Sequence, residues 1–338
     1  MKKTKIAILG GAGFIGHNLA LELSKNKSYE ILIIDNLGVN NLKAKFHTPK
    51  VNKRLLSSIL KNRLNLLKKN KLKTLDINIK NFNLLKKKMI SFKPNYIFHL
   101  AAVSHANISN IDPKYTFDNS VDTLLNTLEI VKILNCHLIY LSSSMVYGNF
   151  NGKKVNENTK CDPLGIYGNF KFMCERMIQS YHQVFNTKYT IIRPSALYGE
   201  RCISRRVGQI FIENALMNKN IEINENGDEK LDFTYIKDFV SGIKKIINNK
   251  KSVNQIFNLT YGSGRKINDL LKILKQYFPN LKVKYANRDK LTPIRGTLSN
   301  TKVRNLLKHK SKFSIDKGYT SYIQWYLDFF KKNKRFLS

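Results

Sequence analysis

The chain has 338 residues, a length that suits a large domain with a smaller second lobe. Its 42% hydrophobic and 24% charged residues are an ordinary globular balance, and no apolar run is long enough to cross a bilayer. The net charge of +36 comes from lysines spread along the chain and not from a nucleic-acid motif. We therefore expect a cytoplasmic protein with no membrane partner and no specific nucleic-acid partner, whose charge favours anionic substrates.

The first half of the chain alternates short apolar runs with helical patterns. The apolar runs predict buried strands at residues 5–9, 31–35, 96–100, 138–142 and 190–193. The helical patterns lie at residues 15–25, 82–91, 116–134 and 167–185. Because strands that alternate with helices pair in parallel, the sequence predicts an α/β fold with a Rossmann-type, doubly wound parallel sheet.

A glycine-rich turn, Gly-Gly-Ala-Gly-Phe-Ile-Gly at residues 10–16, directly follows the first predicted strand and opens the first predicted helix. Gly10 permits the tight turn, Gly13 lets the backbone approach a pyrophosphate, and Gly16 lets the helix pack closely. The helix N-terminus then offers free N–H groups and a positive dipole end to the phosphates. In this context the turn predicts a bound dinucleotide, and a turn without a ligand is the weaker alternative.

Asp35 ends the second predicted strand. A carboxylate at this place accepts hydrogen bonds from the adenosine ribose hydroxyls and repels a 2′-phosphate. No arginine follows it closely, so the sequence favours NAD over NADP; a helix or turn cap is the weaker alternative. The long stretch 38–75 contains an amphipathic run at 54–67, which we interpret as an extra helix over the cofactor side.

After residue 195 the pattern loosens, with turn residues at 224–227 and 261–264. Helical runs follow at 208–217, 236–247 and 268–277. We predict a cofactor-binding Rossmann domain at 1–194 and a smaller, mainly substrate-binding C-terminal lobe at 195–338. Segments near 232–260 are candidates to return to the first domain.

Tyr167 and Lys171 are four positions apart on a predicted helix and so share one face. A phenol with an ordinary pKa of about 10 is a poor base at neutral pH, but a nearby ammonium and a positive nicotinamide favour the phenolate. Serine hydroxyls at 142–144 follow a predicted strand at its carboxyl end, where open α/β sheets bind ligands. Taken alone, the tyrosine and lysine are also explained as an exposed pair on a helix, and the serines as a serine-rich end of a strand.

Jointly the motifs resemble the extended short-chain dehydrogenase/reductases, and within them the NAD-dependent nucleotide-sugar epimerase/dehydratase family. The resemblance covers nearly the whole chain. Its further marks are Asp76-Ile77, His99-Leu-Ala-Ala102, Asp118-Asn119, the turn 146–148, Arg193-Pro194, Tyr198-Gly199, Asp232-Phe233 and the closing segment 323–326.

The resemblance implies roles for the matched positions. Tyr167 is the expected base, Lys171 is expected to bind the nicotinamide ribose and tune the tyrosine, and Ser143 is the expected catalytic hydroxyl. The implied cofactor is NAD, with contacts from Gly10, Gly13, Phe14, Ile15, Gly16, Asp35, Asn36, Asp76, Ile77, Leu100, Ala101, Ala102, Asn119, Tyr167, Lys171 and Pro194. It also implies a homodimer formed by the helices at 116–134 and 167–185.

Ser144 and Met145 follow Ser143. In sugar 4,6-dehydratases of this family the same two positions resemble an Asp-Glu pair, the acid and base that eliminate water. Sugar decarboxylases keep the glutamate at the second position. Met145 cannot exchange a proton, so elimination lacks its base. We therefore predict an NAD-dependent 4-epimerase of a nucleotide sugar, with a transient keto sugar and tightly bound NAD, in sugar-precursor or surface-polysaccharide synthesis. The main alternative is an NAD(P)H-dependent nucleotide-sugar reductase or dehydrogenase. Weaker alternatives are a 4,6-dehydratase, a decarboxylase, or a non-enzymatic NAD-sensing or RNA-associated protein.

Two diphosphate contacts of such relatives are missing, since Ala196 replaces an asparagine and Leu231 an arginine. Nearby arginines could supply the missing diphosphate contacts, although each of them is equally well explained as a surface cation. The candidate substrate residues are Ser104, Ser144, Met145, Arg206 and Arg295, with Arg205 as a further compensating cation. The four cysteines form no Cys-x-x-Cys pair, so we expect free thiols and no metal site.

Overall fold

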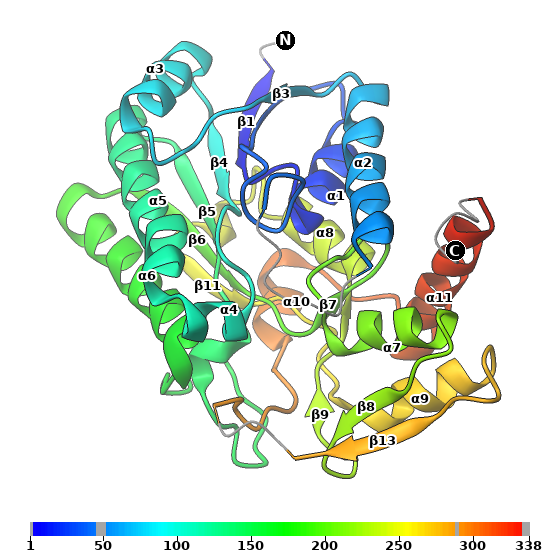
Figure 1. Ribbon diagram of the computed structural model, residues 1–338. Helices are drawn as coiled ribbons and strands as arrows, with labels where there is room; N and C mark the ends of the chain where they lie inside the picture. The colour runs from blue at the N-terminus through cyan, green and yellow to red at the C-terminus, as the bar shows by residue number, and fades with distance from the viewer. Residues whose placement is uncertain (1–2, 45–51, 288–290, 333–338) are drawn as a thin grey trace.

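The computed structural model describes residues 3–44, 52–287 and 291–332. At its centre is a seven-stranded parallel sheet in the order β11-β6-β5-β4-β1-β2-β3 (Figure 1). The strands of this sheet are β1 (Thr4–Leu9), β2 (Tyr29–Ile34), β3 (Lys73–Leu75), β4 (Tyr96–His99), β5 (His137–Leu141), β6 (Lys188–Arg193) and β11 (Gln255–Asn258). The predicted doubly wound α/β class is confirmed.

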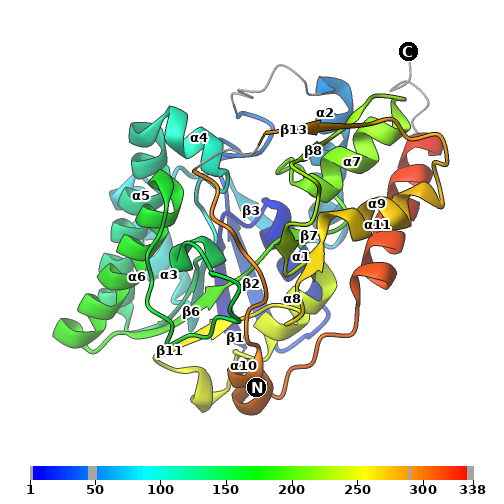
Figure 2. The same cartoon turned by 90° about the horizontal axis from the view of Figure 1, so that it is seen from below.

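Helices cover both faces of the sheet (Figures 1 and 2). One face carries α3 (Phe82–Phe92), α5 (Pro113–Leu134) and α6 (Gly165–Phe185), and the other carries α1 (Phe14–Leu23), α2 (Lys53–Lys69) and α8 (Ile236–Lys244). Strand β1 shows why its sequence is continuously apolar. Ile6 and Ile8 belong to the core on one face and Ala7 and Leu9 to the core on the other, because successive side chains point to opposite faces.

Two helices begin earlier than their apolar patterns predict, because polar side chains cap them. Asp112 accepts a hydrogen bond from Tyr115 N at 2.8 Å and α5 starts with a proline, a favoured first residue. Helix α6 starts where Asn110 Oδ1 accepts a hydrogen bond from Ile166 N at 3.0 Å. Asn110 lies on the short helix α4 (Ala106–Ile111), so a tertiary contact sets the start of α6.

The edge strands β3 and β11 were not predicted as strands. Strand β11 pairs with β6, and α8 packs against α1, so residues 236–258 lie with the main sheet. The other elements are β7 (Leu197–Tyr198), α7 (Val207–Leu216), β8 (Ile221–Asn224), β9 (Lys230–Leu231), β10 (Thr234–Tyr235), β12 (Arg265–Lys266), α9 (Ile267–Lys275), β13 (Val283–Ala286), α10 (Thr301–Leu307), α11 (Ile315–Lys332) and the short 3₁₀ helices η1 (Ser144–Tyr147) and η2 (Lys250–Ser252). In the described part of the chain, no helix is both long and apolar enough to span a membrane.

Two histidines on the central strands are buried in the neutral form. His99 Nδ1 lies 2.9 Å from Thr127 Oγ1, and His137 Nε2 lies 2.8 Å from Thr190 Oγ1. Burial lowers the pKa of His99 to about 3 and that of His137 to about 4. The unfolded chain protonates these histidines below a pKa of about 6.5, whereas the folded chain resists protonation. Folding therefore loses stability as the pH falls from about 6.5 toward about 3.

We expect the free energy of unfolding to fall by roughly 2 kcal/mol per histidine between pH 7 and pH 5. Urea denaturation of the full chain at the two pH values measures this loss. The His99→Gln variant should show a smaller loss than the original chain. An equal loss in both proteins would contradict the assignment to His99.

Candidate active site

One cavity lies at the carboxyl ends of the sheet strands, where the strand order reverses between β1 and β4. Of the residues predicted to bind the cofactor or to catalyse, this cavity is lined by Gly10, Gly13, Phe14, Ile15, Gly16, Asp35, Asn36, Ile77, Leu100, Ala101, Ala102, Asn119, Ser143, Tyr167, Lys171 and Pro194. The one predicted cofactor contact outside the lining is Asp76. These residues follow six different strands or lie on helices, so the parallel sheet brings them to one edge.

The glycine turn fits the pyrophosphate half of a dinucleotide. Gly10 has a φ of +78°, and a Cβ there would lie 2.7 Å from Ala101 N. A Cβ at Gly16 would lie 2.5 Å from Gly10 O. The turn therefore has no room for side chains at Gly10 and Gly16. Phe14 and Ile15, in the first turn of α1 where N–H groups have no partner within a helix, line the cavity.

Asp35 stands just beyond β2 and fits the adenosine ribose. Its Oδ2 accepts a hydrogen bond from Ala12 N at 2.9 Å and its Oδ1 accepts one from Leu37 N at 2.8 Å. Burial raises the pKa of Asp35, while these two backbone hydrogen bonds oppose that rise. A carboxylate has about four acceptor positions, so two remain for ribose hydroxyls.

Asp76 is next to a lining residue of the cavity but does not line it itself. It forms an ion pair with Lys43 at 2.5 Å and is 60% exposed, whereas its neighbour Ile77 lines the cavity. The family resemblance places Asp76 and Ile77 beside the adenine, and this contact stays a prediction. In the structure the carboxylate of Asp76 pairs with an exposed lysine of the long connection after β2.

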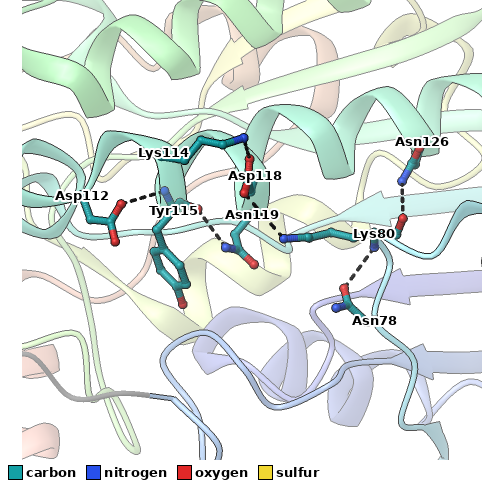
Figure 3. Close-up of polar contacts among 8 residues, drawn as sticks. All are labelled: Asn78, Lys80, Asp112, Lys114, Tyr115, Asp118, Asn119 and Asn126. Atoms are coloured by element: carbon teal, nitrogen blue, oxygen red, sulfur yellow. Dashed lines mark hydrogen bonds and ion pairs between the residues drawn. The ribbon is translucent and has the colours of Figure 1, made fainter.

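Polar contacts with α5 hold the segment after β3 beside the cavity (Figure 3). Asn126 donates hydrogen bonds to the carbonyl groups of Ile79 and Lys80 at 3.0 and 3.2 Å. The Lys80 ammonium lies 3.8 Å from the carboxylate of Asp118 (Figure 3). Asn119, the next residue on α5, donates to a backbone carbonyl one turn earlier and borders the cavity from the same side.

Ser143, Tyr167 and Lys171 border the cavity together, and each side chain is largely buried. Lys171 Nζ donates a hydrogen bond to Leu141 O at 2.7 Å, which ties α6 to the end of β5. Ser143 Oγ accepts a hydrogen bond from Met145 N at 3.2 Å, so its own O–H can be donated to a ligand. A phenol, an ammonium and a hydroxyl so placed can exchange a proton with a substrate hydroxyl and orient it.

A buried ionic network beneath the predicted catalytic residues was missed by sequence reasoning. Arg193 and Glu175 form a two-pronged ion pair with distances of 2.9 and 2.6 Å, and both side chains are at most 3% exposed. Ser142 Oγ donates to the same carboxylate at 2.5 Å. Burial opposes the charge on Arg193, but its hydrogen bonds and charge pairing with Glu175 raise the pKa of the guanidinium above its ordinary value. The network fixes the backbone just before Ser143 and just before Pro194.

A second cavity continues from the first into the region of α7, β8 and α9. The predicted substrate residues Ser104, Met145, Arg206 and Arg295 line both cavities, and Ser144 lines the first. Arg205 lines only the second and pairs with Glu213 at 3.2 Å. Ala196 lines both cavities and Leu231 the second, so both departures from the family pattern lie in this region. Within the described ranges, no group of three or more His, Cys, Asp or Glu side chains is placed to hold a metal ion.

The sequence pattern of the NAD dependent epimerase/dehydratase family matches residues 6–260. The chain belongs to this family of enzymes, and its cofactor is NAD. Among its relatives is the UDP-glucuronate 4-epimerase of Thermodesulfobacterium geofontis, which is 28% identical over 94% of each chain.

Solved structures of similar fold include the UDP-glucuronic acid 4-epimerase of Bacillus cereus in complex with UDP-glucuronic acid and NAD. That chain is 24% identical, with a TM-score of 0.87 over 96% of this chain and 100% of its own. The UDP-glucose 4-epimerase of Thermotoga maritima with UDP-glucose is also 24% identical, with a TM-score of 0.82 over 96% of this chain and 99% of its own. At this identity the likeness establishes the fold.

Proposed function

We propose that this protein is an NAD-dependent nucleotide-sugar epimerase that inverts the configuration at C4. The observation that carries the proposal is the meeting of Ser143, Tyr167 and Lys171 with the glycine turn around one cavity. Met145 borders the same cavity in the place where dehydratases need a proton-exchanging carboxylate, which disfavours elimination of water. The 4-epimerase named among the relatives supports the same reaction.

The glycine turn, Asp35 and Lys171 would hold NAD at this cavity, where it would supply a reversible hydride acceptor. Tyr167 Oη accepts the proton of the sugar hydroxyl as the carbon that bears it is oxidised, and gives the proton back as the carbon is reduced. Lys171, held on Leu141 O, stabilises the negative charge that develops on the phenol oxygen. Ser143 donates its free O–H to the sugar oxygen and holds it in place. The same three residues serve both directions, so no cofactor is consumed.

The second cavity is the proposed place of the nucleotide sugar. Lys219, Lys284 and Arg206 line it, and a cationic wall favours an anionic diphosphate or a carboxylate-bearing sugar. The homodimer stays a prediction, supported by exposed apolar side chains on the outer faces of α5 and α6, such as Leu125 and Met173. The division into lobes at 1–194 and 195–338 and the cytoplasmic location also stay predictions.

Product analysis by NMR tests the proposed reaction. The full chain with NAD is incubated separately with UDP-glucose, UDP-galactose, UDP-glucuronate and UDP-galacturonate. We expect one pair of C4 epimers to interconvert from either side, with no lasting change in the absorbance of reduced cofactor. Stoichiometric reduction of NAD would indicate a dehydrogenase, use of added NADH a reductase, and a 4-keto-6-deoxy product a dehydratase. Each of these three outcomes would overturn the epimerase proposal.

A further inference from the structure

The helix α2, in the long connection between β2 and β3, carries an arginine on its buried face. Leu56, Ile59, Leu60 and Leu67 form that face, with the spacing of an amphipathic helix. Arg63 occupies the same face and is 1% exposed. Arginine is almost never fully buried without a partner, so this position calls for an explanation that packing alone does not provide.

The Arg63 guanidinium is only partly satisfied by the protein. Its Nε and Nη2 donate to Arg201 O at 3.0 and 2.5 Å, whereas Nη1 is buried and makes no hydrogen bond. Within residues 3–44, 52–287 and 291–332, no carboxylate lies within 4.0 Å of it; the nearby Asp35 accepts backbone N–H groups instead. Burial lowers the pKa of Arg63 to about 10, which still leaves it charged at neutral pH.

A second arginine, Arg201, adds positive charge beside Arg63, whereas burial lowers the pKa of His17 and keeps that imidazole neutral. Arg201 Nε donates to His17 Nε2 at 3.1 Å, and His17 Nδ1 lies 2.8 Å from Gly13 O. His17 therefore connects the two arginines, Arg63 and Arg201, to the backbone of the glycine turn. A buried cation without a counter-charge costs several kcal/mol, so this arrangement suits an anion that arrives with a ligand.

We propose that Arg63 is a cofactor-binding residue whose free Nη1 donates to the pyrophosphate of NAD. Arg63 borders the same cavity as Gly13 and Asp35. The carboxylate of Asp35 would repel a phosphate on the adenosine ribose, so the pyrophosphate is the anion that fits. The connection after β2 thus supplies a positive charge that the glycine turn itself lacks. This inference does not depend on which sugar reaction the enzyme catalyses.

Binding of ADP and adenosine to the nucleotide-free full chain, measured by calorimetry, tests the proposal. In the Arg63→Met variant we expect ADP affinity to fall roughly 10- to 100-fold, the loss of a charge-assisted hydrogen bond, with adenosine affinity unchanged. The affinity for ADP should also become less sensitive to salt. Lys61→Met removes an equal charge from an exposed position of the same helix and should leave both affinities unchanged.

The Arg63→Gln variant separates anion binding from bracing of the Arg201 carbonyl. Glutamine can still donate a hydrogen bond to that carbonyl but carries no charge. We expect it to fold, as measured by thermal unfolding, and to lose ADP affinity as Arg63→Met does. Equal losses of ADP and adenosine affinity would show that Arg63 only braces the fold, and unchanged ADP affinity would show that it does not contact the phosphates. Either result would overturn the proposal.

Discussion

Replacing Tyr167 by phenylalanine is expected to lower kcat for epimerisation by roughly 100- to 10,000-fold, the usual contribution of a positioned proton acceptor. The substitution removes one oxygen atom, and the hydroxyl of Tyr167 is not part of any hydrogen bond found in the described structure, so the fold should be unaffected. NAD and nucleotide-sugar affinities should change little, because the ring and the rest of the cavity remain. Initial rates over a range of pH, with the affinities measured separately, test this expectation.

Tyr181→Phe is the matched control, since Tyr181 lies on the same helix but its hydroxyl donates to Glu129 at 2.6 Å, away from the cavity. This variant should keep the full rate. A variant that retained more than about a tenth of the original rate would mean that another group accepts the proton.

The sheet could be predicted from the sequence because each central strand is a short, continuous apolar run buried on both faces. The strands β3 and β11 lack this signal. All three residues of β3 are at least partly exposed, and Gln255 and Ile256 of β11 are only half-buried, since these strands lie at the two edges of the sheet. The cap of α5 was visible in the sequence as Asp112 before a proline, whereas the cap of α6 comes from Asn110 in a different helix.

The candidate site could be predicted nearly whole because its motifs directly follow strands, and parallel strands present their carboxyl ends at one edge. Asp76 shows the limit of this reasoning, since the motif places the residue but not its side chain, which pairs with Lys43. Arg63 lies far from Asp35 in sequence, so the search for a nearby arginine could not find it. The signal that was available is an arginine on the apolar face of the helix predicted at 54–67.

Replacing Glu175 by glutamine is expected to lower the free energy of unfolding by about 3–5 kcal/mol, because it leaves the guanidinium of Arg193 charged and buried without a counter-charge. Urea denaturation at neutral pH measures this loss. Removing both charges in an Arg193→Met, Glu175→Leu double variant should recover much of the stability, since the cost arises from the unpaired charge. Lys114→Met, which breaks the exposed ion pair with Asp118 on α5 (Figure 3), should hardly move the denaturation midpoint.

The same substitutions separate stability from positioning of the catalytic serine. Ser142 donates to Glu175, so the network fixes the backbone that carries Ser143 as well as the core beneath it. The double variant, although stable, should therefore show a lower kcat for the proposed epimerisation than the original chain, with Tyr167 and Lys171 intact. Full activity of a stable double variant would show that β5 and its hydrogen bonds to β6 suffice to place Ser143. A loss of kcat with unchanged NAD affinity would assign the network a positioning role in catalysis.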